Sequence, residues 1–201
     1  IDVATNPLAF TKCVEQYAPQ TVVQLGEQRS APYSMRSSEC AQYTVQNNLC
    51  CTHTILSCMK SNPFHLVHLG TMGVYGYGTI KDSVLPEGYI DVEMDGKTVN
   101  ILHPAYPGSI YHMTKAQDAL MFQFYAKNYG ARITDLHQGI VWGTQTEDTM
   151  IDKRLSNRVD YDETYGTVLN RFIVQGIHKH PLTIYGTGEQ TRAFIHIQNS
   201  V

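Results

Sequence analysis

The amino-acid sequence predicts an α/β fold built on a doubly wound parallel sheet, and three observations support this class. Residues 21–26 and 65–70 are short apolar runs that end in glycine, which is typical of buried strands leading into a loop. Longer segments with helical periodicity are present as well, and they alternate with these runs along the chain. Such alternation favours a parallel sheet with helices on both faces.

Two helices are predicted around these strands. Residues 6–17 place apolar side chains at helical spacing, and residues 37–60 form a long helical candidate with Pro63 just beyond its end. The next stretch, residues 76–109, is polar and rich in proline and glycine. It reads as loops with one candidate hairpin around Asp95-Gly96.

The carboxyl-terminal half contains the clearest unit. Residues 111–129 predict a helix capped by Gly130, and residues 131–141 predict a strand after it. In open parallel sheets the ligand site lies beyond the carboxyl ends of the strands. Three tripeptides are expected at those ends: Gly26-Glu27-Gln28, Gly70-Thr71-Met72 and Gln138-Gly139-Ile140.

The composition excludes several classes of protein. With 201 residues the chain can form one domain with a substantial core. A net charge of −3 and the lack of a basic run give no reason to expect nucleic acid, and no apolar run approaches the length of a membrane span. The five cysteines form no CxxC pattern, which indicates thiols in a reducing compartment. His178-x-His180 has no acidic or cysteine partner at ligand spacing, so no metal is expected.

Tyr111 and Lys115 are the strongest candidates for chemistry. Residues four apart share one face of a helix, so the phenol and the ammonium can point into one site. A nearby ammonium favours the phenolate and is expected to lower the pKa of Tyr111 from its ordinary value near 10. The phenolate could then take an alcohol proton while the carbon gives its hydride to a nicotinamide.

Asp2, Thr71, Tyr111 and Lys115 resemble, in that order, the motif residues of the extended short-chain dehydrogenases/reductases, the nucleotide-sugar epimerases and dehydratases. That family has an acid after an early strand, a Thr or Ser after a middle strand, and then Tyr-x-x-x-Lys. The resemblance runs from residue 1 to residue 201 and implies a Rossmann-like fold and tightly bound NAD.

Longer strings are similar to a sulfosugar-forming branch of this family. They are residues 26–35, 69–73, 170–172, 185–188 and 190–192. This resemblance implies UDP-glucose and sulfite as substrates, with oxidation at C4, loss of water across C5 and C6, sulfite addition at C6, and reduction at C4. It also implies a homodimer, located in the cytoplasm or, in a plant or alga, in the chloroplast stroma.

The resemblance implies three sets of site residues. The catalytic set is Thr71, Tyr111 and Lys115. The cofactor contacts are Asp2, Val3, Gly26, Asn47, Tyr111, Lys115, Gln138 and Val141. The contacts to the sugar nucleotide are Arg29, Thr71, Asn170, Arg171, Tyr185 and Arg192. Arginine suits this task because its guanidinium binds diphosphate oxygens bidentately, although Arg29 could instead serve the sulfite.

Positions 72–74 distinguish this chain from related 4,6-dehydratases. Those enzymes follow the active-site Thr with an acidic pair, whereas Met72 and Gly73 stand here, and Val74 replaces a Glu of some family members. The group that handles the C5 proton therefore stays open. The alternatives are a 4-epimerase or 4,6-dehydratase acting on another nucleotide sugar, and a non-catalytic nucleotide-binding relative.

No glycine-rich phosphate turn precedes residue 26, although such a turn normally opens a dinucleotide-binding sheet. We therefore expect a fragment. Residues 1–142 would be a partial NAD-binding domain, and residues 143–201 the start of the nucleotide-sugar-binding portion. Residues 1–201 alone are expected to bind NAD weakly or not at all, because no helix amino terminus with a glycine turn holds the pyrophosphate.

Overall fold

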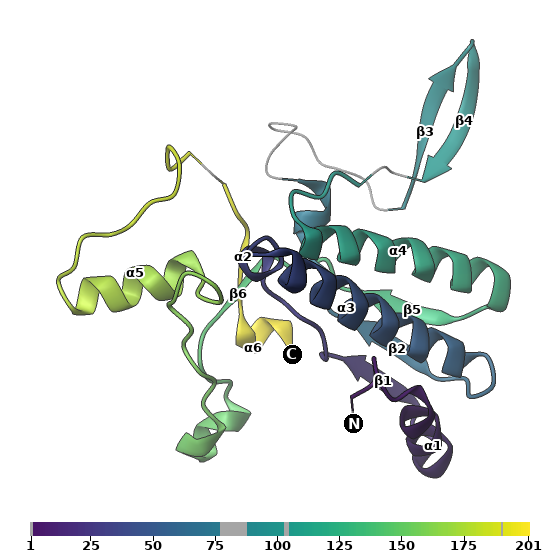
Figure 1. Ribbon diagram of the computed structural model, residues 1–201, viewed down its shortest axis with the longest axis horizontal. Coiled ribbons are helices and arrows are strands. Elements are labelled where there is room, and N and C mark those ends of the chain that lie inside the picture. The colour runs from purple at the N-terminus through teal and green to yellow at the C-terminus, as the bar shows by residue number, and fades with distance from the viewer. Residues whose placement is uncertain (1, 77–87, 103–104, 190) are drawn as a thin grey trace.

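The computed structural model describes residues 2–76, 88–102, 105–189 and 191–201 (Figure 1). Its helices are α1 (Pro7–Tyr17), α2 (Ala31–Ser34), α3 (Ser38–Met59), α4 (Ile110–Tyr129), α5 (Val168–Ile177) and α6 (Ile197–Ser200). Its strands are β1 (Thr21–Gln24), β2 (His65–His68), β3 (Tyr89–Met94), β4 (Lys97–Leu102), β5 (Arg132–Asp135), β6 (Ile140–Trp142) and β7 (Phe194–His196). Short 3-10 helices follow Thr71, Glu147 and Asp152.

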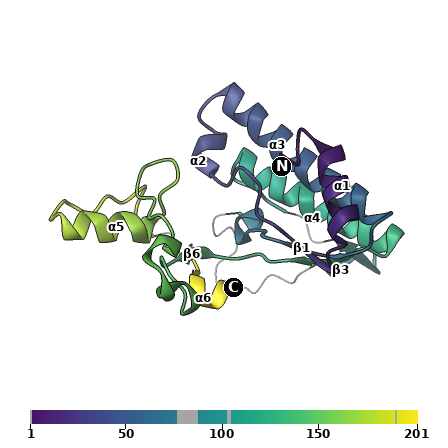
Figure 2. The same cartoon turned by 90° about the horizontal axis from the view of Figure 1, so that it is seen from below.

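The central sheet is parallel, with strand order β1-β2-β5. Within the described ranges, α4 packs on β5, α3 packs on α4, and α1 packs on α3. These three helices share one core with Leu66 of β2, and Figure 2 shows them on the same side of the sheet. This arrangement confirms the predicted α/β class with a Rossmann-like parallel sheet. The prediction of helices on both faces is not met among the described residues, where the helices that pack with this sheet lie on one side. It brings the ends of β1 and β2 side by side, since Gln24 pairs with His68.

The two long helices begin directly after serine residues that cap them. Ser37 caps α3 by accepting a hydrogen bond from the backbone amide of Cys40, and Ser109 caps α4 through His112. Gly130 ends α4 in the left-handed conformation at φ 65°, as its position in the sequence predicts. Both predicted helices are confirmed to within one residue at each end.

A hydrophobic core joins α3, α4 and β2. Leu56 of α3 and Leu66 of β2 have no exposed surface, and Phe122 of α4 is 4% exposed. Burying a Leu or Phe side chain contributes roughly 1.5–3 kcal/mol, so these contacts fix α4 firmly against the sheet. The polar end of α4, which carries Tyr111 and Lys115, is therefore held at the ends of β1 and β2.

The predicted hairpin around Asp95-Gly96 is confirmed as the antiparallel pair β3–β4, which projects from the body of the molecule (Figure 1). The turn suits these residues, because both have positive φ angles, 50° and 72°. Residues 77–87 and 103–104 of the predicted loop stretch lie outside the described residues, as does Gln190.

The predicted single strand over residues 131–141 is wrong. It divides into β5, in the central sheet, and β6, which pairs with β7 in a separate two-stranded sheet. The backbone amide of Ile140 donates to Ala193 O, and a Cβ on Gly139 would collide with that same carbonyl. The chain therefore turns at Gly139 toward a partner strand that is distant in sequence. Among the described residues, no helix has the length and apolar character needed to cross a membrane.

Candidate active site

The start of α4 places Tyr111 and Lys115 one helical turn apart. The backbone amide of Tyr111 donates to Ser34 Oγ at 3.0 Å, which ties the helix start to α2. Ser109 Oγ accepts from the backbone amide of His112 at 3.2 Å and fixes the first turn. Lys115 is only 5% exposed, so its ammonium points into the molecule.

The ammonium group of Lys115 contacts three other residues. Its Nζ lies 2.6 Å from Glu27 Oε2, donates to Leu69 O at 2.7 Å, and lies 3.1 Å from His68 Nε2. Glu27 follows β1, and His68 and Leu69 stand at the end of β2. The ammonium therefore joins the carboxyl ends of two parallel strands to α4.

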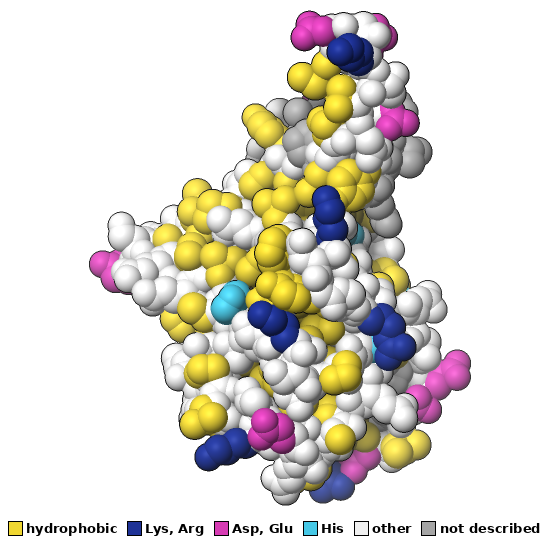
Figure 3. Space-filling model, turned by 90° about the vertical axis from the view of Figure 1, so that its right-hand side faces the viewer, with side chains coloured by type: hydrophobic (Ala, Val, Ile, Leu, Met, Phe, Trp, Pro, Cys, Tyr) yellow, Lys and Arg dark blue, Asp and Glu magenta, His cyan; other side chains and the backbone are white. Residues whose placement is uncertain are grey.

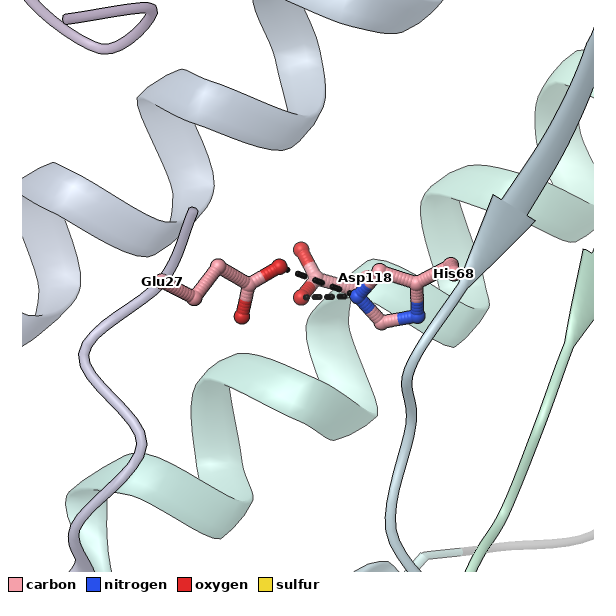
Figure 4. Close-up of side chains that lie close together, drawn as sticks. All are labelled: Glu27, His68 and Asp118. Atoms are coloured by element: carbon pink, nitrogen blue, oxygen red, sulfur yellow. Dashed lines mark hydrogen bonds and ion pairs between the residues drawn. The ribbon is translucent and has the colours of Figure 1, made fainter. Parts of the chain in front are cut away.

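Glu27, His68 and Asp118 form a buried cluster beside Lys115 (Figure 4). His68 Nε2 lies 3.0 Å from Glu27 Oε1 and 3.6 Å from Asp118 Oδ2. One ligand-type atom from each residue lies within 4.8 Å of the others, a spacing that could hold a metal ion. The Lys115 ammonium already supplies the positive charge at this cluster, because it contacts two of the three side chains.

Burial and pairing set the charges of the cluster. Burial opposes ionisation of Glu27, but hydrogen bonding to His68 and the charge of Lys115 outweigh it and lower the pKa of that carboxyl. Burial and the nearby Glu27 carboxylate raise the pKa of Asp118 to about 8, so Asp118 holds a proton at neutral pH. Burial opposes protonation of His68, but hydrogen bonds to the Asp135 and Glu27 carboxylates outweigh it and raise the pKa of the imidazole.

A chain of contacts continues from His68 across the sheet. His68 Nδ1 lies 2.7 Å from Asp135 Oδ1, and His137 Nε2 lies 2.8 Å from Asp135 Oδ2. Burial opposes ionisation of the Asp135 carboxyl, but hydrogen bonds with these two imidazoles outweigh it and lower the pKa to about 2. A side chain at Gly70 would collide with Asp135 and His137, so this glycine is needed for the close approach.

The expectation that Lys115 lowers the pKa of Tyr111 is wrong. Burial raises the pKa of Tyr111, the Glu27 and Asp118 carboxyls raise it further, and Arg29 acts in the opposite direction. The physical reasons are burial of the phenol and the ion pair between Lys115 and Glu27, which balances the ammonium charge. The sequence pattern identified the pair but not its counter-ion.

Thr71 stands at the end of β2, where the sequence places it. Its Oγ1 accepts a hydrogen bond from the backbone amide of Gly73 at 3.1 Å and so caps the turn over Met72–Tyr75. A side chain at Gly73 would collide with the imidazole of His112. The absence of a side chain at Gly73 thus leaves room for His112, which immediately follows Tyr111.

His112 was not among the predicted site residues. It is 8% exposed, its Nδ1 lies 2.9 Å from Ser109 Oγ, and its ring centroid lies 5.1 Å from that of Tyr111. Burial, with a smaller effect of the Arg192 charge, lowers the pKa of His112 to about 4. The imidazole is therefore neutral at pH 7. The feature of the sequence that could have identified His112 as a site residue is its position directly after Tyr111.

Asp160 contacts two of the predicted sugar-nucleotide residues, Arg29 and Asn170. Arg29 forms an ion pair with it at 2.6 Å, Arg158 forms another at 2.6 Å, and Asn170 Nδ2 donates to Asp160 O at 3.2 Å. Arg29 also lies over the ring of Tyr165, 5.3 Å from its centroid. Through these contacts, the loop before α5 packs on the segment that follows β1.

The remaining predicted substrate residues lie on α5 and beyond it. Arg171 is 9% exposed, and its guanidinium lies 4.6 Å from the ring centroid of Tyr185. Arg192 donates to Thr191 O at 2.8 Å, and its charge acts on His112. The structure therefore brings Arg29 and Arg192 within electrostatic range of Tyr111 and His112, respectively.

The predicted cofactor residues are more dispersed. Asp2 accepts hydrogen bonds from the amides of Ala4 and Thr5, and Val3 packs against the core. Gln138 Nε2 donates to Ser200 Oγ at 2.8 Å, and Val141 lies in β6. A Cβ on Gly26 would meet no atom within 4 Å, so packing within the protein does not require this glycine.

Asn47 was predicted at the site, whereas its neighbour Asn48 makes the more extensive contacts. Asn47 Nδ2 donates to Asn48 Oδ1 at 3.1 Å. Asn48 is fully buried; it accepts from the amide of Gln28 at 2.8 Å and donates to Gln28 O and Thr114 Oγ1 at 3.0 and 3.1 Å. It holds the segment after β1 against both long helices.

These features define a class of protein. The model of the NAD dependent epimerase/dehydratase family matches residues 2–201, and the chain belongs to that family. Within it, the chain is 46% identical over 189 residues to UDP-sulfoquinovose synthase, chloroplastic, of Spinacia oleracea, an alignment that covers 93% of this chain and 39% of the relative. It is 40% identical over 200 residues to UDP-sulfoquinovose synthase of Sulfolobus acidocaldarius, covering 98% of this chain and 50% of the relative.

A solved structure agrees with this placement. UDP-glucuronic acid 4-epimerase from Bacillus cereus, in complex with UDP-glucuronic acid and NAD, superposes with a TM-score of 0.63 at 26% identity. The match covers 93% of this chain and 48% of that structure. The chain thus spans about half the length of its solved relative, and 39% to 50% of the two curated ones.

Proposed function

We propose that the complete protein containing this chain converts UDP-glucose and sulfite to UDP-sulfoquinovose, using bound NAD. The two curated relatives support this proposal over nearly the whole of this chain. The observation that carries it is the packing of His112 against Gly73, beside Tyr111. A neutral imidazole then lies next to the position at which related dehydratases have an acidic pair, which suits an enzyme that adds sulfite rather than hydride at C6.

The residues present fit a dinucleotide. The open space at Gly26 leaves room for a close approach to the backbone, and Lys115 and Tyr111 lie on the adjoining helix turn. Asp2, Val3, Asn47, Gln138 and Val141 are proposed to complete the cofactor contacts of this chain. When bound, NAD would supply the acceptor and later the donor of the C4 hydride.

Tyr111 is the proposed acid–base group at C4. In the oxidation, Tyr111 accepts the C4 hydroxyl proton in its phenolate form while the C4 hydrogen leaves as hydride. Its raised pKa disfavours the phenolate in the protein alone, and the positive charge of bound NAD would favour it. The Thr71 hydroxyl is proposed to share a hydrogen bond with the same sugar oxygen. In the final step the proton and the hydride return to C4, so the overall reaction has no net redox change.

His112 is the proposed base at C5. A C4 ketone makes the C5 hydrogen acidic, and a neutral imidazole can accept it. The proton taken from C5 passes to the C6 hydroxyl, which leaves as water. Sulfite then forms the carbon–sulfur bond at C6, and a proton from solvent adds at C5. The lowered pKa of His112 keeps the ring in its accepting form throughout the neutral range.

The diphosphate of the substrate is the proposed ligand of the arginines. Arg29, Arg171 and Arg192 carry charges that suit phosphate oxygens. Tyr185 lies beside Arg171, and Asn170 and Arg29 both contact Asp160. We further propose that residues 1–142 hold the cofactor and that residues 143–201 begin the sugar-nucleotide portion. In Figure 1, α5 lies apart from the central sheet, which supports this division.

A homodimer is the proposed assembly. Helix α4 exposes Leu120 and Phe124, each 54% accessible, and Figure 3 shows hydrophobic side chains gathered on the face below the β3–β4 hairpin. Sedimentation of the complete protein tests this assembly. The proposed location is the chloroplast stroma for a plant or algal protein, in line with the spinach relative, and the cytoplasm otherwise.

The experiment that tests the activity is incubation of the complete protein with UDP-glucose and isotopically labelled sulfite. Mass spectrometry should detect a labelled sulfonated nucleotide sugar whose formation requires both substrates. A 4-epimerase would instead give UDP-galactose without sulfite, and a 4,6-dehydratase would accumulate a 4-keto-6-deoxy sugar. Either outcome, or no product, would reject the proposal.

A further inference from the structure

The carboxylate of Asp160 holds two arginines at once. Its Oδ2 lies 2.6 Å from Arg29 Nη2, and its Oδ1 lies 2.6 Å from Arg158 Nε. Arg29 was predicted to contact the sugar nucleotide, whereas Arg158 was not among the predicted site residues. The fold therefore brings a second guanidinium to the same carboxylate as Arg29.

Most hydrogen-bond donors of these two arginines remain open. A guanidinium carries five N–H donors, and Asp160 uses one nitrogen of each side chain. Within the described part of the chain, neither guanidinium forms a second ion pair. The nearby Asp162 instead accepts hydrogen bonds from the backbone amides of Thr164 and Tyr165. The two arginine side chains are 56% and 77% exposed, so their remaining donors can reach a ligand.

The orientation of Arg29 is fixed by two different contacts. Its guanidinium lies over the ring of Tyr165, 5.3 Å from the centroid, and that ring stacks on Tyr33 at 6.3 Å. The Asp160 carboxylate, itself only 16% exposed, holds Nη2. Because a guanidinium is planar and rigid, a contact on its face and another on its edge determine where its other N–H groups point.

Contacts of the backbone place this group near the start of α4. Ser30 Oγ donates to Thr164 O in the loop before α5. Ser34 Oγ, at the end of α2, accepts from the backbone amide of Tyr111 at 3.0 Å. The short segment that carries Arg29 is thus tied on one side to the loop of Asp160 and on the other to the helical turn of Tyr111.

We propose that Arg29 and Arg158 form one oxyanion-binding site and that Asp160 is the positioning residue that holds both in place. The ligand is an oxyanion group of a substrate, either the diphosphate of the sugar nucleotide or sulfite. Guanidinium groups bind such oxygens through pairs of parallel hydrogen bonds. This inference rests on the proposed function, in which Arg29 faces a substrate, and it adds Arg158 and Asp160 to that site.

Isothermal titration calorimetry of the complete protein tests the site with two probes. UDP is titrated into the free protein, and sulfite is titrated into protein saturated with UDP. Arg158→Gln should raise the dissociation constant of one probe by roughly tenfold or more, because a charged hydrogen-bond donor is lost. A rise for UDP assigns the site to the diphosphate, and a rise for sulfite assigns it to sulfite. Arg154→Gln, which removes another exposed arginine paired with an aspartate, is the matched control and should change neither constant.

Asp160→Asn separates a positioning role from competition for the arginines. If Asp160 positions them, Asp160→Asn weakens binding of the same probe, and Asp160→Glu, which keeps the charge, restores part of the affinity. Unchanged or tighter binding by a folded Asp160→Asn variant would overturn the positioning role. If circular dichroism shows that this variant does not fold, Asp160→Glu replaces it, and an affinity equal to that of the wild type then rejects the role.

The site itself is rejected if Arg158→Gln changes neither constant, or if the wild type binds neither probe. Both titrations measure binding without turnover. Their outcome is therefore separate from whether the protein makes a sulfonated product.

Discussion

At the scale of single residues, proton transfer by Tyr111 carries the proposed chemistry. Replacing Tyr111 with Phe removes the hydroxyl and keeps the ring packing. We expect product formation to fall by roughly 10²–10⁴-fold, the usual contribution of a positioned acid–base group. The rate of formation of the sulfonated sugar measures this, with Tyr89→Phe on the exposed hairpin as the control. A Tyr111→Phe rate within tenfold of wild type would contradict the assigned role.

Asp118 makes the stability of the protein depend on pH. Its folded pKa of about 8 exceeds its ordinary value of 3.8, so between these values the folded state holds a proton that the unfolded state has lost. The free energy of unfolding should therefore fall as pH rises through this window. Asp118→Asn removes this titration and should flatten the decline.

Thermal unfolding at a series of pH values measures the effect of Asp118. The melting temperature of the wild type should drop more than that of Asp118→Asn between about pH 5 and about pH 8. Parallel curves for the two proteins would show that Asp118 is ionised in the folded state throughout. Glu39→Gln, at an exposed position, should follow the wild type.

Some of these residues could be predicted from spacing alone, and others could not. Tyr111 and Lys115 share a helix, so a four-residue interval is enough to pair them. Glu27, His68 and Asp118 come from a loop, a strand and a helix, and nothing local indicates that they meet. The prediction for the pKa of Tyr111 was wrong for the same reason, because the shift depends on burial of the phenol in the fold and on Glu27, 84 positions away in the sequence.

At the scale of elements, Asn48 links the segment after β1 to α3 and α4. Its side chain makes three buried hydrogen bonds to Gln28 and Thr114. Asn48→Ala would leave buried backbone groups of Gln28 unpaired, at a cost of about 2 kcal/mol or more in the free energy of unfolding. Asn47→Ala, one position away and half-buried, should cost less than about 1 kcal/mol. Urea unfolding of both variants measures the difference, and equal losses would contradict the link.

The turn after β2 and the start of α4 meet at Gly73 and His112. In Gly73→Ala the new methyl would displace the imidazole. Misplacing a reacting group by about 1 Å can cost roughly 10²-fold in rate, and we expect a loss of that order with the fold retained. Gly176→Ala is the matched control, because a Cβ there meets nothing within 4 Å. Normal activity of a folded Gly73→Ala variant would show that His112 does not take part in the reaction.

The long helices and the β3–β4 hairpin could be predicted because their signals are local. Periodicity, capping serines and the Asp95-Gly96 turn all lie within the elements themselves. The division of residues 131–141 into β5 and β6 could not, since it depends on pairing with Phe194–His196. A run of alternating apolar residues does not reveal that its two halves join different sheets.

At the scale of the whole molecule, the site combines two portions of the chain. The central sheet and α4 present Tyr111 and Lys115, while the loop before α5 brings Asp160 onto Arg29. The class of fold follows from the order of strands and helices, and the family from motifs along the chain. The junction between the two portions rests on contacts between residues 131 positions apart, which the sequence pattern does not encode.

The central claim is that C4 is oxidised and re-reduced so that C6 can exchange oxygen for sulfur. The most direct test supplies the complete protein with sulfite and UDP-glucose that carries deuterium at C4. Because the same hydride leaves and returns, the sulfonated product should retain deuterium at C4, and in deuterated water it should gain solvent hydrogen at C5. Loss of the C4 label to solvent, or the absence of a sulfonated product, would contradict the account.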